Sequence, residues 1–254
     1  MSLIFELSVY VSFIVFLVLG IGVYAIGRVA LHLLFRHASH DVLSIPIGAF
    51  ISTIATAWAL SLGFVAADIW TANSRADQAT SEERSSISRL IGAASPDILN
   101  VPALRSALVD YREAVVKDEW LKNSNIEPAA TVEIELQNIR RQIVDLARTD
   151  IPTPIITQLV HDFDELQDAR NTRLSVGSTS VDMYKWYLLL FLTILTAITI
   201  SATHADRVVA GVKALIIYST TAAFCLWILA IHANPYQGLE RIEPSLLFTN
   251  HKLG

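Results

Sequence analysis

The sequence predicts an all-α, polytopic membrane protein with four transmembrane helices and a helical soluble domain inserted between spans two and three. Of its 254 residues, 53% are hydrophobic and only 17% are charged, a balance that soluble domains rarely show. The apolar residues gather in two blocks, and the polar stretch between them keeps helical spacing. We expect transmembrane helices 1 and 2 in residues 1–70, the soluble domain in 71–183, transmembrane helices 3 and 4 in 184–233, and a C-terminal tail in 234–254.

Each apolar block holds two spans, because a helix needs about 20 apolar residues to cross the bilayer core. The first span runs roughly from Leu7 to Ile26 and the second roughly from Ile45 to Ala67. The third begins at Trp186, and the fourth covers roughly Val208 to Ile231. The first apolar run has no basic segment before it and no clear cleavage site, so we expect a retained span rather than a signal peptide.

The polar insert is expected to form helices, because its apolar residues recur at spacings of three and four. No Gly or Pro stands between Phe64 and Leu90, so the second span is expected to continue out of the membrane as one long helix. The apolar faces of the insert are formed by Leu104, Leu108, Tyr111 and Val115; by Ile139, Ile143 and Leu146; and by Ile156, Leu159, Phe163 and Leu166.

Four charged residues of the insert fall on these apolar faces: Glu83, Glu119, Arg170 and Arg173. An unpaired charge would be costly there, so we expect the four to pair with one another where the helices meet. The resulting prediction is a structural ion-pair network. An ion- or ligand-binding site is the alternative, since perturbed charges also cluster at functional sites.

The second span carries two different faces when it is wound as a helix. One is a narrow stripe of small residues, which lets a neighbouring helix approach closely. This predicted helix-packing stripe consists of Gly48, Ser52, Ala55, Ala59, Gly63 and Ala66. The other face is bulky and consists of Phe50, Ile51, Ile54, Trp58, Val65 and Ile69. It either meets lipid or, if several copies surround an axis, lines a pore as an apolar constriction that gates by dewetting.

The sequence indicates no enzyme, cofactor or metal site. It has no nucleophile elbow, no phosphate loop and no paired cysteines, and its single cysteine, Cys225, excludes an internal disulfide. His32, His37, His40 and Asp41 crowd one short loop but share no helical face, so a solvated loop is expected rather than a metal site. The net charge of −5 gives no reason to expect a nucleic-acid partner.

Four motifs, taken together and in this order, resemble the bestrophin-like domain family of four-span membrane proteins in bacteria and plants. They are ADQATSEERSSISRL, LRSALVDYREAVVKDEW, ARNTRL and NPYQGLERIEPSLL. The resemblance covers roughly Phe50 to the C-terminus, as judged by motif order. One departure is the absence of an acidic residue just before the last motif's proline, where Ala233 and Asn234 stand. The motifs contain Glu83, Tyr111, Glu119, Trp120, Arg170, Arg173, Pro235 and Gly238.

The resemblance implies a distant similarity to bestrophins, which are pentameric anion channels. By that analogy the chain forms a homo-oligomer in the lipid bilayer of the bacterial cytoplasmic membrane and conducts anions such as chloride. The second span would line the pore, and the soluble domain would lie in the cytoplasm, although the charges that flank the spans do not fix the orientation. The alternative is a non-conducting, membrane-anchored helical module for sensing or protein interaction.

Overall fold

The computed structural model describes residues 9–37, 47–178, 183–205, 207–237 and 241–247, and within these ranges it contains helices and no strand. The all-α prediction is therefore confirmed. Two short elements, the π-helix η1 (Val115–Leu121) and the 3-10 helix η2 (Pro244–Leu247), accompany the α-helices. The α-helices are α2 (Val9–His37), α3 (Ile47–Ala93), α4 (Pro102–Ala114), α5 (Ala130–Leu146), α6 (Thr153–Ser178), α7 (Met183–Thr203) and α8 (Val208–Ile231).

Among the residues that the structure describes, four helices are long and apolar enough to cross a membrane: α2, α3, α7 and α8. The chain is therefore a multi-pass membrane protein, as predicted. It divides into two compact units. The membrane unit comprises residues 1–70, 181–234 and 238–240, and the helical unit comprises residues 71–180, 235–237 and 241–254.

Helix α3 belongs to both units as one unbroken helix of 47 residues. Its apolar half, residues 47–70, lies in the membrane unit, and its polar half, residues 71–93, lies in the helical unit. The predicted continuation of the second span is confirmed. It follows from the absence of any helix-breaking proline along α3.

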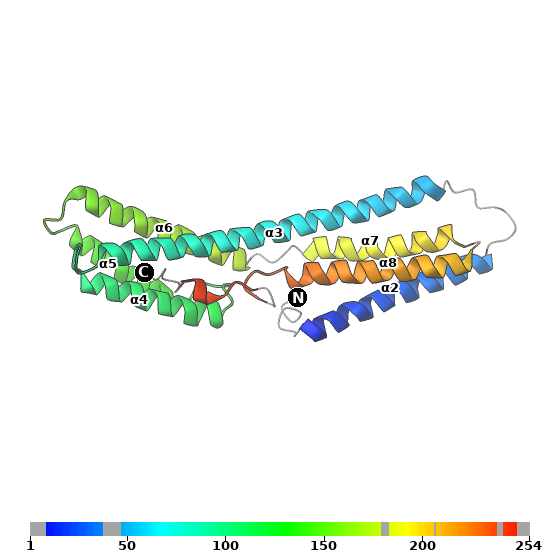
Figure 1. Cartoon of the computed structure of the whole chain (residues 1–254), viewed down its shortest axis with the longest axis horizontal. Helices are drawn as coiled ribbons and strands as arrows, with labels where there is room; N and C mark the ends of the chain where they lie inside the picture. Colours follow the sequence, from blue (N-terminus) through cyan, green and yellow to red (C-terminus); the bar gives the residue numbers. More distant parts are fainter. Residues whose placement is uncertain (1–8, 38–46, 179–182, 206, 238–240, 248–254) are drawn as a thin grey trace. The chain divides into compact units, whose positions relative to one another are not determined.

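In the membrane unit, α2 and the apolar half of α3 lie on opposite sides of the α7–α8 pair (Figure 1). Glycines let α2 approach its neighbours, because a Cβ atom at Gly20 would lie 2.8 Å from Cβ of Ala223 in α8. Ser201 of α7 donates a hydrogen bond of 2.8 Å to the carbonyl oxygen of Gly27. Close packing and an interhelical hydrogen bond therefore hold α2 in place.

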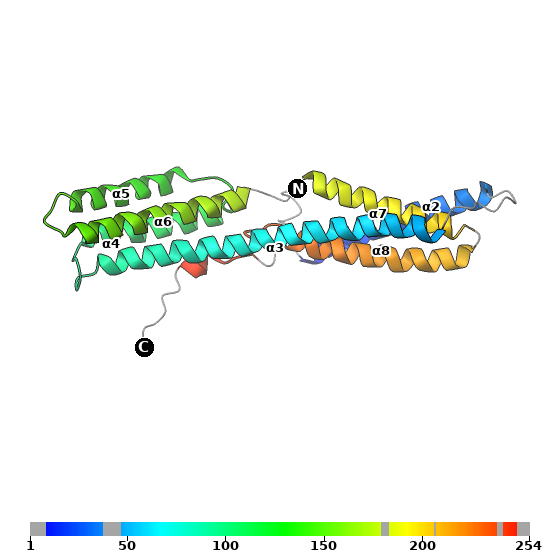
Figure 2. The same ribbon diagram turned by 90° about the horizontal axis from the view of Figure 1, so that it is seen from above.

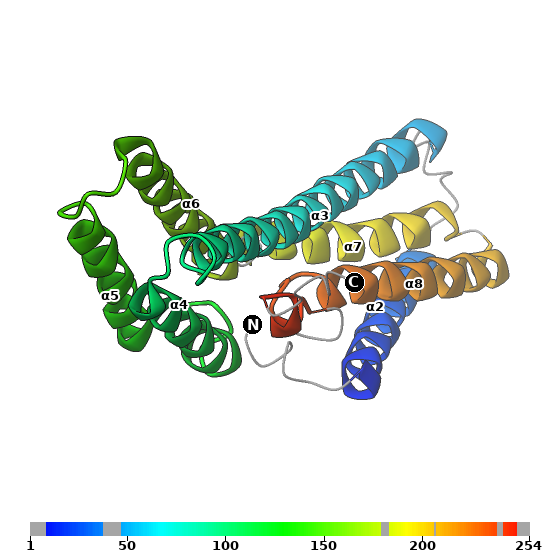
Figure 3. The same ribbon diagram turned by 60° about the vertical axis from the view of Figure 1, so that its left-hand side comes forward.

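In the helical unit, α4, α5, α6 and the polar half of α3 surround one core (Figure 3). Helix α6 lies between α5 and α3 (Figure 2), so its side chains reach both of these helices. The apolar faces predicted for the insert meet in this core. Its buried members include Leu104, Leu108, Tyr111, Val115, Ile139, Ile143, Leu159, Phe163 and Leu166.

A tight turn follows η1 and contacts α6. Ser124 and Asn125 adopt left-handed backbone conformations, with φ angles of 49° and 57°. The Asn125 amide donates a 2.7 Å hydrogen bond to the carbonyl oxygen of Glu119, which closes the end of the π-helix. A Cβ atom at Gly177 of α6 would lie 2.1 Å from the Asn125 carbonyl oxygen, so only glycine fits there.

We predict that Gly177→Ala destabilises the protein by about 1–3 kcal/mol, because the added methyl group clashes with backbone that cannot move aside cheaply. Gly92→Ala is the matched control: a Cβ atom there meets nothing within 4 Å, and alanine favours the helix. Thermal unfolding of the detergent-solubilised protein should show a lower melting temperature for Gly177→Ala only. Equal melting temperatures for the two variants would contradict this packing.

Candidate functional site

The apolar half of α3 is the span with the most open surface. Only 6% of its most apolar stretch is buried inside the chain, against 28% in α2 and 39% in α8. Only side chains on the open face of α3 can contact a neighbouring copy or line a pore, so the burial of each face is described in turn.

The bulky face of α3 packs against the chain's own helices. Val65 and Ile69 are 3% and 1% exposed and lie in a core with residues of α7 and α8. The indole Nε1 of Trp58 donates a 3.0 Å hydrogen bond to Thr193 Oγ1, and its ring packs edge-on against Tyr218 at 5.6 Å between centroids. Val65 and Ile69 are therefore buried inside the chain and do not line a pore. Trp58 links α3 to α7 and α8.

The two remaining pore-lining candidates whose burial is described also lie on the covered side of α3. Ile51 and Ile54 are partly buried on the same side of α3 as Trp58. Gly48 and the Phe50 side chain lie outside the residues whose surroundings the structure describes.

The small stripe of α3 lies largely open instead. Ser52 and Ala59 are exposed, Ala55 is partly buried, and a Cβ atom at Gly63 would meet nothing within 4 Å. Within the described part of the chain, Ala66 is the one member of this stripe that is buried, so the stripe contributes little to the packing of one helix on another. In the described part of the chain, the bulky face of α3 rather than the small stripe supplies most of the packing against α7 and α8.

A third face of α3 points directly away from α7 and α8. We call it the exposed line of α3, and it consists of Thr53, Thr56, Leu60, Phe64 and Ala67. Its members recur at spacings of three and four, so they share one side of the helix. Leu60 is 56% exposed and Phe64 is 69% exposed. This line was not among the predicted site residues, although the two threonines at one end of it are visible in the sequence.

In the helical unit, the four charged residues predicted to pair lie together in one buried cluster, which we call the charge cluster. Arg173 of α6 is fully buried and donates to Glu83 of α3 at 2.6 Å and to Glu119 of η1 at 2.8 Å. Arg170 donates to Glu119 at 2.6 Å and to the half-exposed Glu133 of α5 at 3.3 Å. Two buried positive charges thus balance two buried negative charges.

Neutral groups complete the hydrogen bonding of the charge cluster. The Tyr111 hydroxyl donates to Glu83 at 2.7 Å, and the backbone N–H of Ala129 donates to Glu119 at 3.1 Å. Asn125 accepts a hydrogen bond from Arg173 through its side-chain oxygen, and the Trp120 ring lies 5.4 Å from the Arg173 guanidinium carbon. Asn125 was not predicted from the sequence as a member of the cluster, because its position depends on contacts with η1 and α6, which are distant from it or irregular in structure.

Burial and charge shift the ionisation of the cluster. Burial, reinforced by the negative charge of Glu83, raises the pKa of the Tyr111 hydroxyl well above its ordinary value of 10.0. Burial alone would lower the pKa of the Arg173 guanidinium, but Glu83 and Glu119 raise it above its ordinary value. The arginine is therefore charged and the tyrosine neutral at physiological pH, as a structural ion-pair network requires.

The C-terminal motif covers this cluster. Pro235 is buried, and its carbonyl oxygen accepts a 2.8 Å hydrogen bond from the Ile242 amide. The Trp120 indole donates to the Ile242 carbonyl oxygen at 3.2 Å, and the Tyr236 ring packs edge-on against Trp120 at 5.4 Å. Gly238 lies outside the described residues, as do His40, Asp41 and the His37 side chain from the loop considered for a metal.

Comparisons with known proteins agree with this architecture at the level of the family. A family model described as "Bestrophin-like domain" matches residues 14–247, which is nearly the whole chain. No curated protein and no solved structure matches the chain.

We predict that Arg173→Ala and Arg170→Ala each destabilise the protein by about 3–5 kcal/mol, because each leaves the buried carboxylates of Glu83 and Glu119 with only one buried positive charge between them. Chemical denaturation of the solubilised protein measures this loss. Arg148→Ala is the control: its pair with Asp145 is exposed on both sides, so its removal should change little. An unfolding free energy unchanged by Arg173→Ala would show that the cluster is not a structural network.

We also predict a loss of stability in alkaline solution that depends on Tyr111. Its folded-state pKa is raised, so its contribution is fully present below about pH 10 and is lost as the pH rises through the folded pKa. Tyr111→Phe should lower stability at pH 7 by removing a hydrogen bond, yet flatten the decline above pH 10. Denaturation at pH 7 to 11 checks this, and an equally steep decline in both proteins would refute it.

Proposed function

The chain belongs to the bestrophin-like domain family, and from this premise we propose that it forms a homo-oligomeric, anion-conducting channel whose pore is lined by the exposed line of α3. One observation carries the proposal. The exposed line belongs to the span with the least burial inside the chain, and it combines hydroxyl groups with bulky apolar groups.

The order of residues along the exposed line suits a pore. Thr53 and Thr56 stand at one end of the line, and the exposed Thr56 hydroxyl can donate a hydrogen bond to a partly dehydrated anion. Leu60 and Phe64 follow, one turn apart and largely exposed. A ring of such side chains around an axis forms an apolar constriction, which gates by losing its water.

The small stripe supports the assembly of several copies. Ser52, Ala59 and Gly63 flank the exposed line and leave room for a neighbouring helix. A neighbouring copy placed there turns both exposed lines toward a common axis, and a rotation that repeats this contact closes a ring. By analogy with bestrophins we propose five copies, in a bacterial cytoplasmic membrane, with the helical unit in the cytoplasm.

We predict that the purified protein in planar bilayers carries an anion current and that Phe64→Ala enlarges the current per channel, since it widens the constriction. Phe191→Ala is the matched control: Phe191 is 62% exposed, but on α7. It should leave the current unchanged.

Two results would contradict the proposal. A correctly assembled oligomer that carries no current would favour the non-conducting sensing or interaction module. A real current that neither Phe64→Ala nor Leu60→Ala changes would place the permeation path away from the exposed line of α3.

A further inference from the structure

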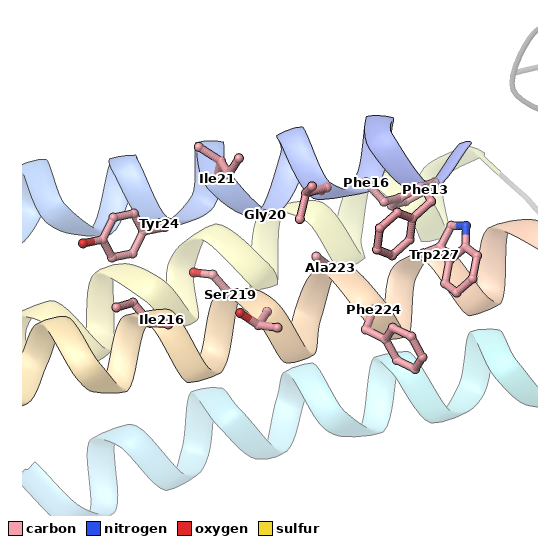
Figure 4. A pocket seen from close by; sticks show the side chains of 12 residues that line it. Phe13, Phe16, Gly20, Ile21, Tyr24, Ile216, Ser219, Ala223, Phe224 and Trp227 are labelled. Carbon is pink, nitrogen blue, oxygen red and sulfur yellow. The ribbon is translucent and has the colours of Figure 1, made fainter. Parts of the chain in front are cut away.

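A groove runs between α2 and α8 in the membrane unit. Its cavity volume is about 250 Å³, and its lining is almost wholly apolar. Its floor is the close contact between Gly20 and Ala223, and its walls are side chains of the two helices (Figure 4). Leu17 and Ile21 on the α2 wall are about half exposed, so the groove opens toward the hydrocarbon of the bilayer.

Aromatic rings gather at one end of the groove. Phe13 and Phe224 both pack on Trp227, at centroid distances of 5.1 Å and 5.6 Å (Figure 4). Phe16 lies beside them, and Tyr24 lies at the other end. Such a lining favours a flat ring, because aromatic groups gain from offset or edge-on contacts with one another.

Ser219 lies in the groove with an unsatisfied hydroxyl group. It is only 4% exposed, and its Oγ has no hydrogen-bond partner among the described residues. Several other hydroxyls of the membrane unit, such as those of Thr193 and Thr221, donate to the carbonyl oxygen four residues earlier. Ser219 departs from that pattern, so it is left with a hydrogen to donate to a molecule in the groove.

The depth of Ser219 narrows the choice of acceptor. It is the twelfth residue of the 24-residue helix α8, which puts it about 18 Å from either end of the span. The ester carbonyls of phospholipids stay near the headgroups and do not reach this depth. We therefore look for an acceptor on a membrane-soluble molecule whose polar group can enter the hydrocarbon core.

We propose that this groove binds the ring of a membrane-soluble quinone, with a ring carbonyl accepting a hydrogen bond from Ser219. The volume suits one substituted ring, since benzene occupies an apolar cavity of about 150 Å³. The open side lets an alkyl tail lie among the lipids. Among the described residues, Trp227 also has an unpaired Nε1–H, but it stands about 12 Å farther along α8, so one ring carbonyl does not reach both Trp227 and Ser219.

This site is independent of the proposed pore, because α2 and α3 lie on opposite sides of the α7–α8 pair. A lipid acyl chain could fill the groove, but it would leave the Ser219 hydroxyl without an acceptor. A second copy of the chain would close the groove to small molecules. Both occupants are therefore outcomes that the experiment distinguishes from a quinone.

The experiment titrates the full-length protein in detergent with a decyl-substituted benzoquinone and follows quenching of tryptophan fluorescence. Trp227 lines the groove, so it reports occupancy directly. We expect saturable quenching whose amplitude falls in Trp227→Phe. Ser219→Ala should weaken the saturable phase about 5-fold, the effect of one neutral hydrogen bond. Thr221→Ala removes a hydroxyl from an exposed position of the same helix and should change nothing.

Decylbenzene provides the second arm, because it has the same tail and ring size but no carbonyl. If the carbonyl contributes to binding, decylbenzene should compete only weakly and leave most of the saturable quenching by the quinone in place. Quenching that never saturates, or that Trp227→Phe leaves intact, would overturn the proposal. Equal displacement by decylbenzene, or equal affinity of Ser219→Ala, would identify the groove as a plain lipid contact.

Discussion

The buried stripe along α3 is the constraint on which the rest of the structure depends. Val65 and Ile69 in the membrane unit and Glu83, Ile87 and Leu90 in the helical unit lie on one side of this single helix, at helical spacing. The hydrogen bonds from Arg173 of α6 to Glu83 fix the polar part of that stripe against α6. Both side chains are fully buried, so neither charge can be solvated by water in place of its partner. Within each unit, the residues of α3 on the side opposite this stripe are mostly exposed.

The charge cluster explains several features that would otherwise look unrelated. Arg173 needs two carboxylates, and the π-helix places one of them, Glu119, beside Glu83. The left-handed turn at Asn125 supplies a further acceptor, and Gly177 gives that turn the space it needs. Each element satisfies a polar group that burial would otherwise make costly.

The spans, the helical insert and the pairing of the four charges could be predicted from the sequence. The length of an apolar segment shows whether it can cross the bilayer. A charged residue on an apolar helix face is costly to bury unless a residue of opposite charge pairs with it. The faces of α3 could not be assigned in the same way. A helical wheel separates Trp58 from Ala59, but it does not say which of them meets α7. That choice rests on Thr193 and Tyr218, which are far away in the sequence. The role of Asn125 could not be predicted for a similar reason, since its conformation depends on its contacts with η1 and α6.

The central claim is that the exposed line of α3 faces the same line of neighbouring copies, and cross-linking in native membranes tests it most directly. With Cys225→Ser as the background, Leu60→Cys and Phe191→Cys each place one thiol on an exposed position of a different span. Disulfides need Cα atoms within about 7 Å, so oxidation joins only residues that meet near a symmetry axis. The account predicts linked dimers from Leu60→Cys and none from Phe191→Cys. The reverse pattern would contradict it.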